Sequence, residues 1–348
     1  MLRRRCGGRI ARATRVLVGA AILLGIARAP VPAEVGVAPG LRVELVVTGI
    51  PRPLQLAFGP AERLLVLSHG LGGDAAEIHR LDLAGTPPLD ASRAPKFVIP
   101  YAGPRKTTLG SLAVDPRTGD LFFGEENGNR IYRFTAAGKL VPFATGLHYL
   151  VGGTSLAFDG AGRLVVVDYA GPAGQFRPES PPPPGLDWLM AEAYQGPLVF
   201  RLDPRADLPL PRRLDLLPPL FPKAGGRRPA GDALPRFVSV AIPSDGDPRL
   251  LGSLGELFRL TSESVLERLA RLPAGHYHRT NMAVAPDGSV LVAGGFHIRR
   301  LFWISPTGLV SVVAWNLGDP GGVVVDRAGW VYVAETALHR VIRIRPAP

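Results

Sequence analysis

The sequence has a single cysteine, Cys6, close to its first residue. One thiol forms no intramolecular disulfide and holds no iron–sulfur cluster, because both need further cysteines. The chain also lacks C-x-x-C, H-E-x-x-H, the nucleophile elbow G-x-S-x-G and a phosphate-binding glycine loop with its lysine. These absences argue against dithiol redox chemistry, metalloprotease chemistry of the H-E-x-x-H type, α/β-hydrolase chemistry and P-loop nucleotide hydrolysis.

Residues 1–33 have the composition of an export signal. They contain seven arginines and no acidic residue, then the apolar run Val16 to Ile26, then Val31-Pro32-Ala33, which suits a cleavage site. This run is too short to cross a bilayer, which takes about 20 apolar residues. We therefore predict a signal peptide over 1–33, rather than a membrane anchor, and a periplasmic or secreted mature chain. The residues after Arg3-Arg4-Arg5 lack the apolar character of a twin-arginine signal, which favours general secretion.

Most of the positive charge lies in this leader. Subtracting its seven arginines from the net charge of +11 leaves +4 for the rest of the chain, and these charges are spread out. No basic stripe with interleaved aromatic residues remains, so nucleic-acid binding is not indicated. Cys6 precedes the apolar run, so it is not placed as a lipoprotein cysteine. We expect a monomer that is not attached to a membrane once the leader is cleaved.

What the chain does contain is a repeated pattern of short strands. Its last stretch, Gly321 to Pro346, has three β-branched segments, and Asp326 and Gly329 bracket a tight hairpin between the first two. The same pattern begins again at Ser111, at Ser155 and at Asn281. The sequence therefore encodes a repeat protein.

The spacing of the repeats predicts the fold. Markers equivalent to Asp326 are separated by 56, 44, 84, 42 and 41 residues. A unit of just over forty residues with four short strands is typical of a β-propeller. The interval of 84 equals two units and leaves a seventh blade open, but Pro172 to Gln195 has no paired hydrophobic strands. We predict six blades, with Pro-rich insertions near 171–196 and 218–235. The markers are Gly59, Asp115, Asp159, Pro243, Ala285 and Asp326.

A lone strand at Leu41 to Thr48 precedes the first repeat. Leu41, Val43, Leu45 and Val47 alternate with their neighbours, as expected for one buried face. The last repeat supplies three strands where a blade needs four, so we predict that this strand completes it and closes the ring. The expected structure is one all-β domain over 34–348, a six-bladed propeller with four antiparallel strands per blade.

These repeats resemble the six-bladed propellers of the regucalcin/gluconolactonase, NHL-repeat and soluble quinoprotein sugar dehydrogenase families. In a propeller the loops before first strands and after second strands meet at one mouth of the central channel. Polar residues gather in any loops, yet six of the seven histidines fall in these ones. We predict a polar mouth for a metal or a polyhydroxylated ligand. Its members are His69, His148, His276, His278, His297 and His339, with Glu125, Glu126, Asn127, Asp168, Tyr169, Arg279 and Glu335.

The segment from Gly275 to Thr280 resembles the His-and-Arg segment that enters a Pro-Asp-Gly hairpin in soluble quinoprotein sugar dehydrogenases. That resemblance implies an imidazole that accepts a proton as hydride leaves a sugar, and a guanidinium that holds a quinone carboxylate. It makes His276, His278 and Arg279 the candidate catalytic residues. Ring closure should bring them within reach of Glu335, and of Glu125 or Asp168 across the channel.

The resemblance to gluconolactonases implies a different test. Those enzymes hold a divalent ion with Glu, Asn and Asp side chains five residues before the turn marker. None of the equivalent positions here is a carboxylate or an asparagine, although Asn281 is one position away, so the site is not matched. The positions are Leu54, Gly110, Thr154, Val238, Thr280 and Gly321.

Three functions stay open at this point. The first is an exported propeller that binds a small polar molecule or a protein segment at the channel mouth, without catalysis. The second is a quinone- or metal-dependent sugar or alcohol dehydrogenase. The third, a gluconolactonase-like hydrolase, is disfavoured because the metal-ligand positions are not matched. The cofactor is unknown, with a quinone and a divalent metal as the candidates.

Overall fold

The computed structural model describes residues 34–70, 74–98, 108–126, 129–147, 155–170, 196–223 and 235–347. These residues belong to one compact unit, Glu34–Pro348. Within them the chain forms β-strands and short 3₁₀ segments, and none of the described helical segments is long and apolar enough to span a bilayer. The predicted signal peptide and most of the insertion near 171–196 lie outside the described residues. The 3₁₀ segments are Pro60–Glu62, Ala91–Arg93, Leu214–Leu216 and Thr336–Leu338.

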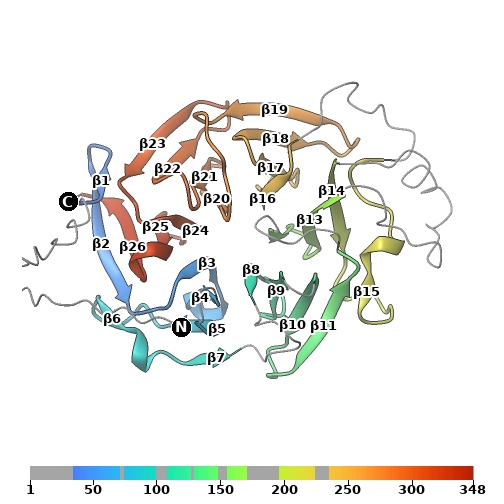
Figure 1. Cartoon of the computed structure of the whole chain (residues 1–348), viewed down its shortest axis with the longest axis horizontal. Helices are drawn as coiled ribbons and strands as arrows, with labels where there is room; N and C mark the ends of the chain where they lie inside the picture. The colour runs from blue at the N-terminus through green and yellow to red at the C-terminus, as the bar shows by residue number, and fades with distance from the viewer. Residues whose placement is uncertain are drawn as a thin grey trace, which may run out of the picture. The chain divides into compact units, whose positions relative to one another are not determined.

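Six small sheets are arranged in a ring around a central axis (Figure 1). Each sheet starts with an innermost strand and continues outward in chain order, which is the arrangement of propeller blades. The prediction of six blades is confirmed, and the interval of 84 residues holds one blade with an insertion. The innermost strands are β3 (Pro53–Phe58), β8 (Leu109–Val114), β12 (Leu156–Phe158), β16 (Phe237–Ala241), β20 (Met282–Val284) and β24 (Pro320–Val325).

The other strands of each blade pair antiparallel, one after the next. They are β4 (Leu64–His69), β5 (Ala76–Leu81) and β7 (Lys96–Val98) in blade one; β9 (Leu121–Glu125), β10 (Arg130–Phe134) and β11 (Leu140–Thr145) in blade two; β13 (Leu164–Ala170) and β14 (Gly196–Leu202) in blade three; β17 (Arg249–Gly252), β18 (Glu256–Leu260) and β19 (Leu266–Arg271) in blade four; β21 (Val290–Ala293), β22 (Arg300–Ile304) and β23 (Val310–Trp315) in blade five; and β25 (Val331–Glu335), β26 (Arg340–Pro346) and β2 (Leu41–Thr48) in blade six.

The hairpin between first and second strands explains why the repeat is visible in the sequence. In blade six the Asp326 carboxylate accepts a hydrogen bond from the Trp330 amide at 2.8 Å, and Gly329 has φ +80°. In blade three Asp159 and Gly162 take the same roles, with Gly162 at φ +74°. Aspartate fixes the turn through backbone amides, and glycine adopts the left-handed conformation without strain.

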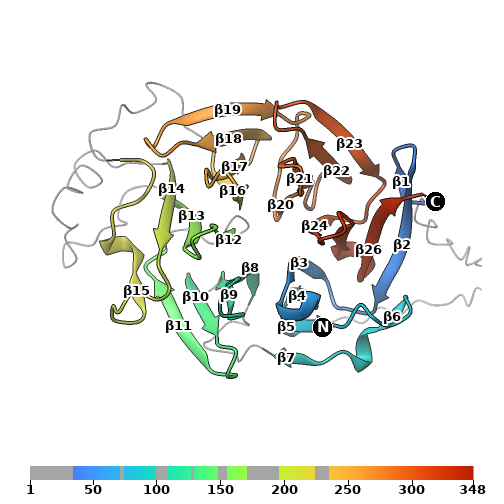
Figure 2. The same cartoon turned by 180° about the vertical axis from the view of Figure 1, so that it is seen from behind.

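The N-terminal strand closes the ring as predicted. β2 pairs with β26 along its whole length, on the outside of blade six (Figure 2). Leu41, Val43 and Leu45 pack in the seam between blades five and six. Val47 does not share their face, because a β-bulge between Leu45 and Val47 shifts the register, and it packs with Val46 between blades six and one. The predicted alternation is wrong at that position for this reason.

Short additional strands cover the outer edges of three blades. β1 (Gly36–Val37) pairs with β23 of blade five, β6 (Leu89–Asp90) with β2 of blade six, and β15 (Arg212–Arg213) with β11 of blade two. Unpaired outer strands are templates for edge-to-edge aggregation, and these segments cover part of that edge.

Blade three differs from the prediction in its outer part. The sequence Arg213 to Leu217 predicts a further strand of this blade, but Arg213 pairs with blade two instead, and Leu214–Leu216 is a 3₁₀ turn. Within the described residues blade three has three strands, and a single bridge between Val199 and Phe221 stands in the fourth place.

Six hydrophobic clusters form the core, one in each seam between neighbouring blades. In the seam between blades two and three, the rings of Phe122 and Phe143 meet edge to face, with centroids 4.9 Å apart. A fully buried aromatic or aliphatic side chain contributes about 1.5–3 kcal/mol. The blades are therefore held rigidly to one another, and the loops at the channel mouth stand on a fixed scaffold.

Candidate functional site

The two ends of the central channel differ in chemistry. Towards the hairpin turns a cavity of about 360 Å³ is lined by residues of the innermost strands, most of which have apolar side chains. The lining includes Leu56–Phe58, Leu112–Val114, Met282–Val284 and Val323–Val325, with Asn281 as a polar member. The predicted polar mouth lies at the opposite end, where second strands such as β4 and β9 finish.

A buried ion pair crosses the polar mouth. Arg279, in the loop before β20 of blade five, donates to both carboxylate oxygens of Glu126, at 2.9 and 3.0 Å. Glu126 follows β9 of blade two, on the other side of the ring. The exposed fraction is 10% for the Arg279 side chain and 4% for that of Glu126. A bidentate pair in this setting is both strong and geometrically fixed.

His69, at the end of β4 in blade one, is the third member of this network. Its Nδ1 lies 2.5 Å from the carbonyl oxygen of Leu109. A carbonyl oxygen only accepts, so Nδ1 carries the proton, and Nε2 is left to accept from the Arg279 guanidinium, which it contacts. Burial, followed by the charge of Arg279, lowers the pKa of His69 to about 3. His69 is therefore a neutral acceptor that orients Arg279.

The loop after β21 of blade five lies over this network. Phe296 places its ring 5.6 Å from the Arg279 guanidinium and packs against the cluster between blades one and two. Gly295 makes the crossing possible, because it has φ +75° and a Cβ there would lie 2.0 Å from the His278 carbonyl oxygen. Arg279, Glu126, His69 and Phe296 thus form one contacting group at the polar end of the channel, which we call the mouth network.

Three histidines of blade five lie next to this network, and one of them, His278, contacts Phe296. The ring centroids of His276, His278 and His297 are 5.9, 5.9 and 6.2 Å apart. His276 and His297 are exposed, whereas His278 is half-buried beside Phe296. Burial, and then the charge of Arg279, lowers the pKa of His278 to about 4. Its Nδ1 is buried and makes no hydrogen bond within the described residues. The cluster thus presents a neutral imidazole that can accept a hydrogen bond or a proton.

Comparison with known proteins places this geometry in a wider set. No protein-family model and no curated protein matches the sequence. Solved structures do match. The PQQ domain of pyranose dehydrogenase from Coprinopsis cinerea is 13% identical over 90% of this chain and 97% of its own, with a TM-score of 0.57. The chain shares its six-bladed fold. A gluconolactonase from Xanthomonas campestris is 16% identical over 88% of this chain and 90% of its own, with a TM-score of 0.55. Virginiamycin B lyase from Staphylococcus aureus is 12% identical over 90% of this chain and 89% of its own, with a TM-score of 0.50.

The six-bladed propeller does not bring every predicted site residue to the histidine cluster. Glu335 is fully buried and serves its own blade, since it accepts hydrogen bonds from the Gly318 amide at 2.8 Å and from Arg340 at 2.5 Å. The carboxylate that reaches Arg279 is Glu126 instead. The expectation that Glu335 pairs with this cluster is wrong, because both of its oxygens are aimed at blade six.

The other predicted residues of the propeller mouth sit at the ends of second strands. Glu125 ends β9 and lies 3.2 Å from Arg130. Asp168 is buried near the end of β13, with Tyr169 half-buried after it. Asn127 and His148 lie outside the described residues. His339 is on the blade-six side, where its Nδ1 accepts a hydrogen bond from the Arg52 amide at 3.2 Å.

The metal-ligand positions of gluconolactonases are taken up in other ways in this propeller. A Cβ at Gly110 would lie 2.7 Å from a Glu126 carboxylate oxygen, so the glutamate occupies the space beside that glycine. The Thr280 hydroxyl donates to the Ala293 carbonyl, and Asn281 donates to Gln55. In the described parts of the chain, no three His, Cys, Asp or Glu side chains are grouped so as to hold a metal ion.

Proposed function

We propose that this chain is an exported propeller that binds a small polar ligand at the histidine cluster of its channel mouth. The observation that carries the proposal is His278, a half-buried neutral imidazole whose buried Nδ1 makes no hydrogen bond within the described residues, set between the exposed His276 and His297. An unsatisfied buried polar atom is costly, and a ligand group that reaches it recovers that cost.

The chemistry of the cluster favours a ligand with several hydroxyl groups. Imidazoles can donate and accept, which suits hydroxyls that do both. Two of the structural neighbours are named for reactions of sugars or their lactones, the pyranose dehydrogenase domain and the gluconolactonase. We therefore infer a sugar or sugar-acid derivative as the ligand class.

A second candidate function is proton transfer from the bound ligand to His278. The lowered pKa of His278 keeps the imidazole unprotonated at neutral pH, which is the form that accepts a proton, and it also makes His278 a weaker base than a free histidine. A histidine-to-alanine variant of the structurally similar virginiamycin B lyase is described as catalytically inactive, which fits a histidine base on this fold.

The described residues of the mouth do not fit a quinone held by its carboxylates. Such a cofactor needs cations that are free to bind it, and Arg279 already donates to both oxygens of Glu126. We therefore propose a binding site with a neutral base, without a quinone.

The test uses residues 34–348 and a panel of sugars, aldonates and aldonolactones in calorimetric titrations. Replacement of His276 and His278 by alanine should remove the binding that the parent shows and leave the unfolding midpoint in place, because these side chains contribute little to the core. His339→Asn is the matched control, since asparagine tolerates the left-handed backbone of that residue. Unchanged affinity in the double variant contradicts the proposal.

Export and oligomeric state have their own measurements. We propose that the leader over 1–33 directs secretion and that the mature protein is a monomer. N-terminal sequencing of protein recovered from the periplasm or medium should begin at Glu34, and sedimentation should give the mass of one chain. Retention of the full chain in the cell, or a dimer at micromolar concentration, contradicts one or the other part.

A further inference from the structure

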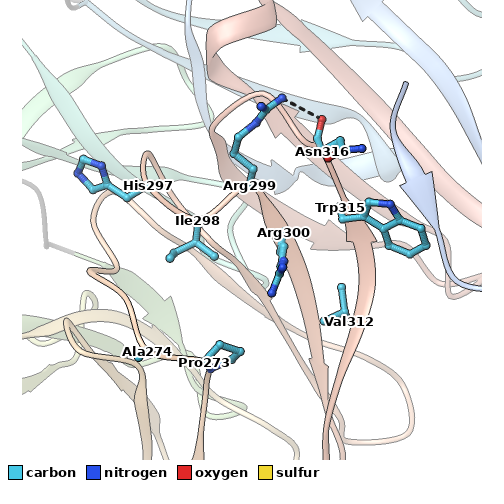
Figure 3. A pocket seen from close by; sticks show the side chains of 9 residues that line it. All are labelled: Pro273, Ala274, His297, Ile298, Arg299, Arg300, Val312, Trp315 and Asn316. Atoms are coloured by element: carbon cyan, nitrogen blue, oxygen red, sulfur yellow. Dashed lines mark hydrogen bonds between the residues drawn. The ribbon is translucent and has the colours of Figure 1, made fainter. Parts of the chain in front are cut away.

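A second cavity, of about 600 Å³, lies in the seam between blades four and five (Figure 3). It shares His297 with the histidine cluster, and it has no lining residue in common with the channel cavity described above. Pro273 and Ala274 line one side, from the segment that leaves blade four. Blade five supplies the rest of the lining, which consists of His297, Ile298, Arg299, Arg300, Val312, Trp315 and Asn316.

A row of three cross-strand partners shapes one wall of this cavity. Arg300 in β22 is paired with Trp315 in β23, and Trp315 is paired with Gly36 in β1. Paired residues share a face of the sheet, so both side chains start from the same face, and from there Arg300 runs towards Pro273 and the indole towards β1 (Figure 3). A Cβ at Gly36 would be 2.2 Å from the indole ring, so the ring rests on the backbone of β1. Trp315 keeps 39% of its surface exposed, in a fixed position.

The charges in the cavity are unevenly paired. Arg299 donates to the carbonyl oxygens of Leu317 at 2.8 Å and of Asn316 at 3.4 Å, and the half-buried Asp319 interacts with its charge. The Arg300 side chain is exposed and makes no hydrogen bond or ion pair within the described residues. One guanidinium fork is therefore available in a cavity that Trp315, Ile298 and Val312 also line.

We propose that this cavity binds a small aromatic carboxylate, with the carboxylate on Arg300 and the ring against Trp315. A guanidinium matches a carboxylate with two parallel hydrogen bonds, which a neutral ligand cannot replace. An indole face favours a flat ring by stacking, and Ile298 and Val312 cover the rest of an apolar body. The volume is in the range of small-molecule sites. This ligand and site are distinct from the polar ligand proposed for the channel mouth.

The test compares 2-naphthoate with its neutral match, 2-naphthylmethanol, by calorimetric titration of the folded 34–348 protein. The acid should bind and the alcohol should bind at least about tenfold more weakly. Arg300→Gln should weaken naphthoate binding by about tenfold or more, and Gly36→Ala should weaken it by displacing the indole. Added salt should weaken binding as well, because Arg300 is exposed. Arg268→Gln, at an exposed arginine of β19, is the matched control and should change nothing.

Several results would overturn the proposal. They are the absence of naphthoate binding at millimolar concentration, equal affinity for the alcohol, and unchanged affinity in the Arg300 variant. The double replacement of His276 and His278 separates the two sites. It should leave naphthoate binding intact, and loss of binding there would place naphthoate at the mouth. An unchanged unfolding midpoint in each variant ensures that an altered affinity is local.

Discussion

The ion pair between Arg279 and Glu126 allows a quantitative prediction, because it is almost completely shielded from water. Replacing Glu126 by glutamine leaves the guanidinium buried with one good acceptor in place of two. Removing one partner of a buried pair costs about 3–5 kcal/mol, and the retained amide oxygen places this change near about 3 kcal/mol. That is a large part of the about 5–15 kcal/mol by which a typical domain is stable.

The assay is chemical unfolding at pH 7 of the parent, Glu126→Gln, Arg279→Met and the double variant. The double variant should lose less stability than the sum of the two single changes, since it leaves no unpaired charge. Arg327→Met is the control, because its 2.9 Å contact with Glu62 is exposed (89% and 43%) and should be worth about 0–1 kcal/mol. The reasoning would be refuted if the coupling energy between Glu126 and Arg279 were no larger than the free energy of unfolding that is lost in Arg327→Met.

Three further predictions concern the closure, the histidines and the loop. Deleting residues 34–48 should lower the melting temperature steeply, because buried side chains of β2 are worth about 1.5–3 kcal/mol each; melting within a few degrees of the parent would contradict this. The free energy of unfolding should fall as the pH drops from about 6.5 towards 4, because histidines are protonated in the unfolded chain over this range, whereas in the folded chain the pKa of His69 is about 3 and that of His278 about 4. His69→Gln should flatten this dependence, as measured by urea titrations at pH 7 and 5. Gly295→Ala should destabilise the protein and abolish ligand binding at the mouth, since the new methyl group meets the His278 carbonyl; calorimetry that shows parent affinity would rule this out.

The fold was predictable because its determinants are local and repeated. An aspartate stands at the marker position in three of the six blades, and a glycine with positive φ stands in the turn of five, so most hairpins can be read directly from the sequence. The closure followed from counting strands, since one lone strand at the start matched one missing strand at the end. The partner of Arg213 was not predictable in this way, because a two-residue strand has no periodicity and its place on blade two depends on the neighbouring blade.

The site was predictable only as a set of loops. Successive residues at the end of a strand point to opposite sides, so choosing between Glu125 and Glu126 requires the backbone conformation at that point. The contact from Glu126 to Arg279 spans 153 residues and two opposite blades, and no spacing rule encodes it. Phe296 was missed as well. Its only signal in the sequence is an aromatic residue directly after Gly294-Gly295, which marks a close approach of backbone.

The pairing of β2 with β26 has a consequence for how the chain reaches its native state. The hydrogen bonds from Arg343 to Glu44 join residues 299 positions apart. β2, near the start of the chain, therefore cannot pair until β26, near its end, is in place. Contacts of such separation are slow to form, and until then the edge of β26 is open to other chains. Once formed, the same contact has to break before either end can peel away. We expect slow folding and slow unfolding, so that the lifetime of the closed ring, more than its equilibrium stability, sets how long the protein stays folded.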